Sequence, residues 1–522
     1  MISHLRRTKI IATLGPAITQ KLTTFASLEN PDNQAIVQKA YTTTKAALLA
    51  GINVARLNFS HGSHEEQLVR AKIVRDVARE LKRPVSLMLD TKGPEIRVFQ
   101  MEQDSGVLFT AGSIIMIHTT EKIIGSSTSF SVIDSTGTYN MAKDVNVNDK
   151  ILVDDGKLSL EVAKVDVDQG LIEAIVLNDH LLKTNKRINL PSSKYTIPFL
   201  SDKDRNDILL AIEHQFNYIA VSFVNTKENL LDIKAILDAN HGSHIKLIAK
   251  IETRQGIDNI DEIISVADGV MIARGDLGLE VPYYEVPYWG KYIIKKCRYA
   301  NIPVIMATQM LDSLEKNIIP TRAESSDVFW AVELGVDATM LSGESAQGLY
   351  PVNAINVMSR LDRQSEIFFD YKRSLETYFI HSPKFNTPLY QFAKKIAETV
   401  IPKREIMNSG FTYQGIAIFG PSEQLIQAIS AARPATRVLV FTNDPNVYYG
   451  SGVLYGILPI LVEDVSHAQM YAADYLKAYY DNQVQTRRDS KLTRRTLVVC
   501  GTDLYEIDNN TAITGVEVKI LH

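Results

Sequence analysis

The chain has 522 residues, of which 45% are apolar and 22% are charged, and its net charge is −4. A chain of this length is expected to form roughly two to four domains. The weak negative charge argues against a broad nucleic-acid-binding surface, and no apolar run reaches the length of a transmembrane helix. We therefore expect neither nucleic-acid nor membrane partners.

Two cysteines, Cys297 and Cys500, are too few and too far apart to form a disulfide framework. This usage favours a reducing compartment, which we take to be the cytoplasm. The first apolar run, Ile10–Leu14, is too short for the core of a signal peptide, and we expect a strand there.

Short apolar runs alternate with helical patterns through the first two thirds of the chain. The runs are Lys9–Leu14, Ile52–Leu57, Pro84–Leu89, Tyr218–Phe223, Ile245–Ile251, Gly269–Ala273, Ile302–Ala307 and Asp337–Leu341. The helical patterns include Glu65–Lys82, Asp202–His214, Lys227–Asn240, Tyr284–Tyr299 and Arg322–Leu334. Eight strand–helix units predict a closed parallel (β/α)8 barrel, the TIM barrel, within an α/β fold.

Polar side chains gather at the ends of these runs. They are Arg56, Asn58, Ser60, Asp90, Lys92, Ser222, Lys250, Glu252, Asp276, Thr308, Ser342 and Glu344. The carboxyl ends of barrel strands open on one mouth, where barrel enzymes carry their active sites. The pattern therefore predicts an active site built from these residues.

The segment from Ile245 to Pro282 carries the most distinctive chemistry. Its two strands end near Lys250 and Glu252 and near Asp276, and Gly256–Val266 has the spacing of a helix between them. Two carboxylates suit Mg²⁺, and an ammonium beside them can neutralise a phosphoryl group in transfer. Gly275 and Gly278 flank Asp276 and would let backbone amides approach an anion. When this segment is considered by itself, the alternative interpretation is a βαβ unit whose loop charges are only solvated.

Helical periodicity is lost between Val98 and about Asn189, where β-branched alternation and turn signals predict an inserted β domain that acts as a lid. After about Phe369 a polar, aromatic-rich connector leads to a C-terminal α/β domain with about five strands, at Gly415–Phe419, Arg437–Thr442, Ile457–Val462, Thr496–Cys500 and Val516–Leu521. The expected division is barrel at 1–95 and 191–370, lid at 96–190 and C-terminal domain at 371–522. The basic run Thr486–Arg495 is read as a solvated loop or helix end.

In motif after motif, from Arg6 to Glu366, the chain resembles pyruvate kinase. The matching motifs are RRTKIIATLGPA from Arg6, GINVARLNFSHG from Gly51, LDTKGPEIR from Leu89, SFV from Ser222, AKIE from Ala249, DGVMIARGDLGLEVP from Asp268, PVIMATQMLDS from Pro303, PTRAE from Pro320 and MLSGESAQGLYP from Met340. The resemblance implies phosphoryl transfer from phosphoenolpyruvate to ADP, giving pyruvate and ATP as the last step of glycolysis. It also implies Mg²⁺ or Mn²⁺ and K⁺ as cofactors, and a homotetramer.

The resemblance assigns roles to particular residues. Lys250 matches the lysine beside the phosphoryl group, and Glu252 and Asp276 match the ligands of the divalent metal. Gly275, Asp276 and Thr308 match the pocket for the substrate carboxylate, near Ser222. Ser342 and Glu344 match a polar network near the enolate, the expected route of the proton. The catalytic set is then Lys250, Arg56, Thr308 and Ser342.

Nucleotide and K⁺ sites follow in the same way. Arg56 and Arg97 match arginines near the phosphates, and Asn58, His61 and Lys186 complete the nucleotide-binding set, with Asp155 near it in the lid. The K⁺ ligands are matched by Asn58, Ser60, Asp90 and Thr91, and Glu95 matches the K⁺-requiring class. Arg187 departs from the family, because glycine is usual at its position.

Two other functions compete with an active pyruvate kinase. A catalytically retired relative would be expected to have lost Lys250, Glu252 or Asp276, and all three are present. A lyase that acts on phosphoenolpyruvate or pyruvate would share the carboxylate pair but lack the nucleotide-side segment, here Arg56–Gly62.

Many family members bind an activating sugar phosphate in the C-terminal domain. The corresponding segment, Phe419–Gln424, offers one hydroxyl, at Ser422, together with Pro421 and Glu423, and the second segment, Gly501–Gly515, has three acidic residues and no arginine. Proline has no amide hydrogen and the carboxylates repel a phosphate. We therefore expect no activation by fructose 1,6-bisphosphate.

Overall fold

The computed structural model describes residues 6–191, 193–401, 411–472, 474–476, 493–500, 503–508 and 511–513. Eight parallel strands in this part of the chain form a closed barrel in the order β1-β17-β16-β15-β14-β13-β3-β2. They are β1 (Lys9–Thr13), β2 (Val54–Asn58), β3 (Ser86–Asp90), β13 (Tyr218–Val221), β14 (Lys246–Ile251), β15 (Gly269–Ala273), β16 (Val304–Ala307) and β17 (Ala338–Leu341). The predicted (β/α)8 barrel is confirmed, strand by strand.

The barrel strands read as continuous apolar runs because both of their faces are buried. Successive side chains of β1 point to opposite faces, so that Ile10 and Ala12 pack against the helices while Ile11 packs inside the barrel. The interior is filled by side chains such as Met88, Tyr218 and Met271. The barrel is thus a packed core with its polar groups at the rim.

Helices surround the barrel. They are α1 (Pro16–Thr19), α2 (Phe25–Glu29), α3 (Gln34–Ala50), α4 (His64–Glu80), α5 (Asp202–Glu213), α6 (Lys227–Ala239), α7 (Arg254–Asp258), α8 (Ile260–Val266), α9 (Arg274–Glu280), α10 (Val286–Ala300), α11 (Arg322–Leu334), α12 (Gly343–Ala346) and α13 (Pro351–Ser365). Several begin with a side-chain cap, as at Ser63, Ser201 and Thr321.

One local expectation was wrong. The helix expected over Gly256–Val266 is two helices, α7 and α8, which meet at Asn259, and its start lies at Arg254. The segment after β15 forms α9 (Arg274–Glu280), with Asp276 in its first turn. A carboxylate there is favoured by the free amides at a helix start.

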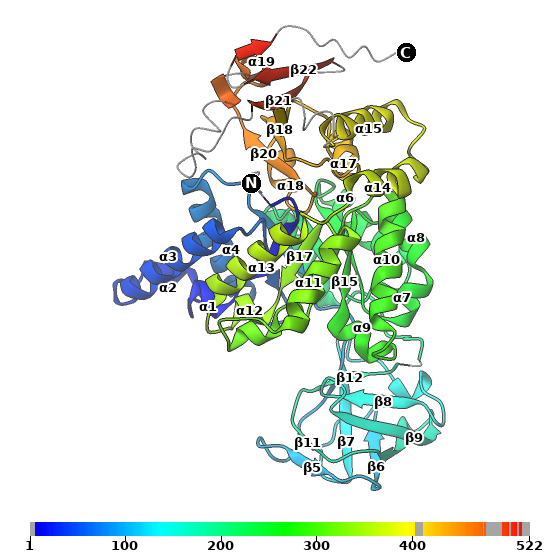
Figure 1. Cartoon of the computed structure of the whole chain (residues 1–522). Coiled ribbons are helices and arrows are strands. Elements are labelled where there is room, and N and C mark those ends of the chain that lie inside the picture. The colour runs from blue at the N-terminus through cyan, green and yellow to red at the C-terminus, as the bar shows by residue number, and fades with distance from the viewer. Residues whose placement is uncertain are drawn as a thin grey trace.

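The insert between β3 and α5 is a second closed barrel, in the order β10-β6-β7-β4-β12-β8-β9. Its strands are β4 (Ile96–Val98), β6 (Ile114–His118), β7 (Ser129–Asp134), β8 (Lys150–Val153), β9 (Leu158–Asp166), β10 (Leu171–Val176) and β12 (Arg187–Asn189), while β5 (Val107–Phe109) and β11 (His180–Leu182) pair separately. Figure 1 shows this insert at one end of the large barrel. It has its own core, around Phe109, Phe130 and Leu160.

Among the described residues of the C-terminal part, six strands form a sheet in the order β20-β19-β18-β21-β22-β23. The strands are β18 (Phe411–Phe419), β19 (Val438–Thr442), β20 (Ile457–Leu461), β21 (Thr493–Cys500), β22 (Asp503–Asp508) and β23 (Thr511–Ile513), and the helices are α14 (Tyr371–Thr377), α15 (Pro388–Val400), α17 (Glu423–Ala431), α18 (Pro445–Gly450) and α19 (Val465–Met470).

The predicted α/β class of this part is confirmed, but its strand list was incomplete. β22 and β23 are antiparallel additions to the sheet within the segment 501–515, the second predicted effector segment. The expected connector contains α14, whose Leu375 belongs to the core of the C-terminal part. The strand expected at Val516–Leu521 lies outside the described residues, as does most of the basic run Thr486–Arg495.

The C-terminal part contacts the end of the barrel where the parallel strands begin, and Figure 1 shows it opposite the insert. Arg433 forms a two-pronged ion pair with Asp337, at 2.6 and 2.8 Å, and its guanidinium stacks on the ring of Tyr455. Lys9 donates to the carbonyl of Ile457. The three parts have separate apolar cores, and their division near residues 95, 190 and 370 stays a prediction.

Candidate active site

A cleft with about 1060 Å³ of empty space opens between the carboxyl ends of the barrel strands and the insert. Most of the predicted site residues line it: Arg56, Asn58, Ser60, His61, Asp90, Lys92, Glu95, Arg97, Asp155, Lys186, Ser222, Lys250, Glu252 and Asp276. They come from five barrel strands or the segments after them and from the insert. The fold therefore brings together residues that lie up to 220 positions apart, from Arg56 to Asp276.

Lys250 lies near the end of β14 and is almost buried. Its ammonium donates to Asp90 at 2.9 Å and to the hydroxyl of Ser222 at 2.7 Å, and lies 3.2 Å from a carboxylate oxygen of Glu252. Burial would lower the pKa of Lys250, but the carboxylates of Asp90 and Glu252 outweigh it and raise that pKa. A fixed positive charge therefore faces the cleft.

Asp90, at the end of β3, joins the lysine to a second cation. Arg56 donates to Asp90 from Nε at 2.6 Å and to the hydroxyl of Thr13 from Nη1 at 2.7 Å. Burial would raise the pKa of Asp90, but Arg56 and Lys250 hold it below its ordinary value. Both cations at the cleft floor are thus held in place by one ionised, buried carboxylate.

Glu252 follows β14 and is buried, and its Oε2 accepts the backbone amide of Phe223 at 2.7 Å. Burial raises the pKa of Glu252, and Lys250 opposes that effect. Asp276, in α9, accepts from the guanidinium of Arg187 on β12 of the insert. Among the described residues no three His, Cys, Asp or Glu side chains form a metal-binding group.

The donor chemistry of this pair nevertheless suits a hard divalent cation. Glu252 and Asp276 line the same cleft, and Mg²⁺ is commonly held by one or two protein carboxylates, with water and substrate oxygens filling its other positions. Each of these two carboxylates now faces a cation of the protein. Together they carry two negative charges, which can balance a divalent ion.

Three non-glycine residues at the barrel mouth have positive φ, the left-handed region. Phe223 has φ 57°, and Thr308 and Gln309, after β16, have φ 63° and 51°. The Thr308 hydroxyl accepts the amide of Gly275 at 2.7 Å and donates to the carbonyl of Ala307 at 2.7 Å. Such conformations are uncommon for bulky or β-branched residues, and strained positions of this kind cluster at functional sites.

Some predicted residues do not line the cleft. Ser342 lies after β17, where its amide donates to Glu344 at 2.7 Å, and burial raises the pKa of Glu344 to about 7. Gly275 and Thr308 also lie outside the cleft lining, beside Asp276. Thr91 lies behind the cleft, where its hydroxyl accepts the amide of Ser222 at 3.1 Å.

The nucleotide-side residues form ion pairs of their own. Arg97 donates to both oxygens of Glu95, at 3.0 and 3.1 Å, and Lys186 lies 2.8 Å from Asp154 in the insert. Burial, reinforced by Arg97, lowers the pKa of His61, so its imidazole is neutral near pH 7. Three of the four predicted K⁺ ligands, Asn58, Ser60 and Asp90, line the cleft.

Sequence reasoning missed Asp154 and the contact of Arg187 with Asp276. Asp154 and Asp155 both have positive φ in the turn before Gly156, and Asp154 accepts from Lys186 and His180. The Asp-Asp-Gly turn signal was visible in the sequence, but the partners of Asp154 were not.

Comparison with known proteins places this site in a family. A family model described as the barrel domain of pyruvate kinase matches residues 5–355. A pyruvate kinase of Mycoplasma pneumoniae is 52% identical over 89% of this chain and 91% of its own length, and one of Mycoplasma genitalium is 47% identical over 96% and 98%.

Solved structures agree. The crystal structure of a pyruvate kinase from Cryptosporidium parvum superposes with a TM-score of 0.82 at 31% identity, covering 96% of both chains. The motifs of the barrel mouth, the three-part fold and these relatives lead to one conclusion: the chain belongs to the pyruvate kinase family.

Proposed function

We propose that the cleft between the barrel and the insert is where this chain carries out the reaction of its family, phosphoryl transfer from phosphoenolpyruvate to ADP. The observation that carries this proposal is the convergence of Lys250, Arg56, Glu252 and Asp276 on one cleft. Two cations and two carboxylates at this place can bind a phosphoryl group and a divalent metal together.

Lys250 would stabilise negative charge as the phosphoryl group leaves and the enolate of pyruvate forms. It is suited to this task because Asp90 and Ser222 hold its ammonium in one position. Arg56 is equally fixed by Asp90 and Thr13 and would bind phosphate oxygens with its planar guanidinium.

Glu252 and Asp276 would hold Mg²⁺, or Mn²⁺, which would neutralise negative charge on the substrate. The substrate carboxylate would lie near Gly275, Asp276 and Thr308, with Ser222 beside Lys250. Ser342 and Glu344, joined by a hydrogen bond, would form part of the proton route to the enolate. The raised pKa of Glu344 supports a role in proton exchange.

The nucleotide would bind between Arg56, Asn58 and His61 of the barrel and Arg97 and Lys186 of the insert. Because these residues come from two domains, closure of the insert would complete the nucleotide site and exclude water. Asp155, which lines the cleft at the tip of a turn, would face the nucleotide.

One assay tests the proposed function. Pyruvate formation from phosphoenolpyruvate is measured with Mg²⁺ and K⁺, with and without ADP. We expect pyruvate only when ADP is present. No pyruvate in either case would identify a retired relative, and ADP-independent release would identify a lyase.

Potassium is expected to activate the enzyme strongly. Asn58, Ser60, Asp90 and Thr91 supply hard oxygens, and Glu95 brings a negative charge where a lysine would supply a positive one. Glu95 is already bonded by Arg97, so its charge is partly balanced within the cleft. Initial rates in KCl and NaCl at matched ionic strength should differ severalfold or more; equal rates would contradict the proposed K⁺ site.

Fructose 1,6-bisphosphate is expected not to activate the enzyme at micromolar levels. The Ser422 hydroxyl already accepts the amide of Leu425 as a helix cap, and Glu423 pairs with Lys246 at 2.7 Å. Asp503–Asp508 in the second segment is a strand; its other residues lie partly outside the described chain. Phosphoenolpyruvate saturation curves with and without the sugar bisphosphate should overlay, and a clear left shift would overturn this prediction.

We propose that the protein is a homotetramer and that it is located in the cytoplasm. Within the described residues, no helix has both the length and the apolar character needed to cross a bilayer. Light scattering coupled to gel filtration tests the assembly, with a mass near four times 58.3 kDa expected.

A further inference from the structure

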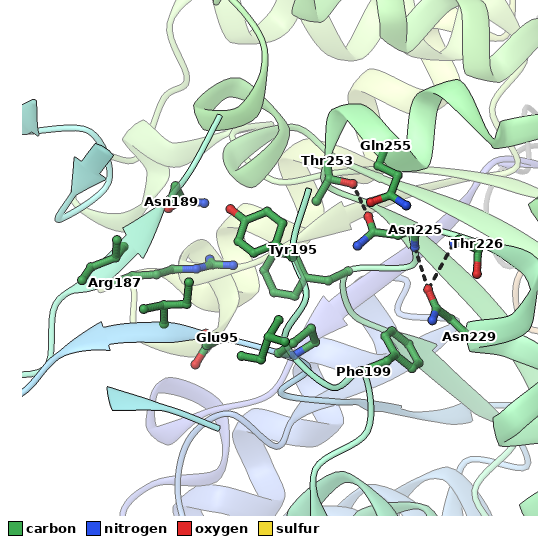
Figure 2. A pocket seen from close by; sticks show the side chains of 15 residues that line it. Glu95, Arg187, Asn189, Tyr195, Phe199, Asn225, Thr226, Asn229, Thr253 and Gln255 are labelled. Atoms are coloured by element: carbon green, nitrogen blue, oxygen red, sulfur yellow. Dashed lines mark hydrogen bonds between the residues drawn. The ribbon is translucent and has the colours of Figure 1, made fainter. Parts of the chain in front are cut away.

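Arg187 occupies a position between two hollows of the structure. A side pocket with about 690 Å³ of empty space lies next to the active-site cleft, between the insert and the barrel. The two hollows share Glu95, Arg187 and Phe223 as lining residues. Figure 2 shows the side chain of Arg187 extending from β12 toward Tyr195 at the edge of this pocket.

The guanidinium of Arg187 is held by the barrel, although its backbone belongs to the insert. It donates to Oδ1 of Asp276 and stacks on the ring of Phe223, 4.6 Å from the ring centroid. Only 16% of the side chain is exposed. Burial would lower the pKa of Arg187, but Asp276, Glu95 and Glu252 outweigh it and raise that pKa. The charge of Arg187 is therefore permanent.

This contact conflicts with metal binding. Asp276 is one of the two carboxylates assigned to the divalent cation, and Arg187 already uses one of its oxygens. A guanidinium and a divalent cation on the same carboxylate would repel each other, so each would weaken the binding of the other. The two cations therefore compete for Asp276.

We propose that Arg187 is an internal competitor of the divalent metal: its guanidinium neutralises Asp276 in the free enzyme and swings into the side pocket when the metal binds. This inference rests on the proposed metal site. Arg187 acts on the metal through Asp276 and is a positioning residue.

The side pocket can receive the guanidinium through side-chain rotation alone. The backbone of Arg187 is fixed by two contacts. β12 pairs with β4 where Arg187 lies opposite Arg97, and the carbonyl of Arg187 accepts the amide of Asp154 at 3.0 Å. The pocket offers the carboxylate of Glu95, which Arg97 already contacts, together with the ring of Tyr195 and side-chain amides such as Asn189 and Asn225. A carboxylate, an aromatic face and amide oxygens are groups that a displaced guanidinium can contact.

The exchange also concerns the insert. Arg187 belongs to the insert and Asp276 to the barrel, so their ion pair ties the two bodies together. Metal binding would break this one tie, while Asn189, also on β12, stays bonded to Glu280 of α9 at 3.1 Å.

The test measures Mn²⁺ binding to the free enzyme, without substrates, from the electron paramagnetic resonance signal of unbound Mn²⁺. Arg187→Ala is expected to bind Mn²⁺ about tenfold more tightly than wild type, because the competing charge is gone. Arg187→Met, which keeps the stem on Phe223, should show the same gain. Arg187→Lys, which keeps the charge, should stay within about threefold of wild type.

The matched control is Lys186→Ala. It removes one positive charge from the same cleft, one residue earlier in the chain, but its ammonium pairs with Asp154 and not with Asp276. Its Mn²⁺ affinity should stay within about twofold of wild type, since no ion pair to a metal ligand is lost. An equal gain in Lys186→Ala would show a general charge effect and overturn the specific role of Arg187.

Asp276→Asn separates this inference from the proposed metal site. If Asp276→Asn weakens Mn²⁺ binding while Arg187→Ala and Arg187→Met match wild type or bind more weakly, the metal site stands and the competitor role is wrong. If Asp276→Asn leaves binding unchanged, the metal site itself is wrong and the inference falls with it. Weakened binding in Asp276→Asn with a tenfold gain in both Arg187 variants supports the proposal.

Discussion

Replacing Lys250 with methionine is expected to reduce turnover by on the order of a thousandfold or more, because a fixed charge aimed at a developing anion contributes several kcal/mol. Methionine keeps the apolar stem but removes the ammonium that Asp90, Ser222 and Glu252 surround. The measurement is kcat in the coupled pyruvate assay, with circular dichroism to confirm the fold.

Lys246→Met is the matched control for this variant. Lys246 lies at the start of the same strand, at the far end of the barrel, where it pairs with Glu423. Its loss removes a surface ion pair, and we expect kcat within about twofold of wild type. A well-folded Lys250→Met enzyme with near-normal kcat would show that the lysine has no part in the chemistry.

Glu252→Gln and Asp276→Asn are each expected to raise the Mg²⁺ concentration for half-maximal activity by at least about tenfold, since each replaces a charged oxygen ligand with a neutral one. Asp261→Asn is the control: this exposed carboxylate pairs with Lys296 on the outside of the barrel and should leave the Mg²⁺ titration unchanged. Titrations of both site variants that overlay wild type would place the metal elsewhere.

The barrel was predictable because the sequence pattern that specifies each of its strands is local. Each strand is a short run buried on both faces, and each run ends at polar residues, as Val54–Asn58 and Ser86–Asp90 do. The break between α7 and α8 was not predictable, because the apolar spacing of Gly256–Val266 continues across Asn259. β22 was missed because its acidic residues resemble a loop, whereas pairing with β21 makes it a strand.

The candidate site was predictable in part. Motif spacing assigned Lys250, Glu252 and Asp276, and topology predicts that strand ends meet, so their convergence could be anticipated. The partner of Asp276 could not be anticipated: Arg187 lies 89 residues earlier, in another domain, and their contact depends on how the insert docks on the barrel. The left-handed backbone of Thr308 likewise has no local signal, since threonine disfavours that conformation.

The large barrel closes where its first strand, β1, pairs with its last strand, β17. β1 pairs with β17 from Lys9 beside Ala338 to Ala12 beside Leu341, and the amides of Arg7 and Thr8 donate to Glu366. A ribosome adds about 5–20 residues per second, so roughly 15–65 s pass between the synthesis of β1 and that of β17, its second neighbour in the barrel. During synthesis, KIIAT is thus an apolar strand with one open edge, the kind of surface that pairs with other chains. The yield of this protein in a cell should depend on how well that first strand is shielded until the last one arrives.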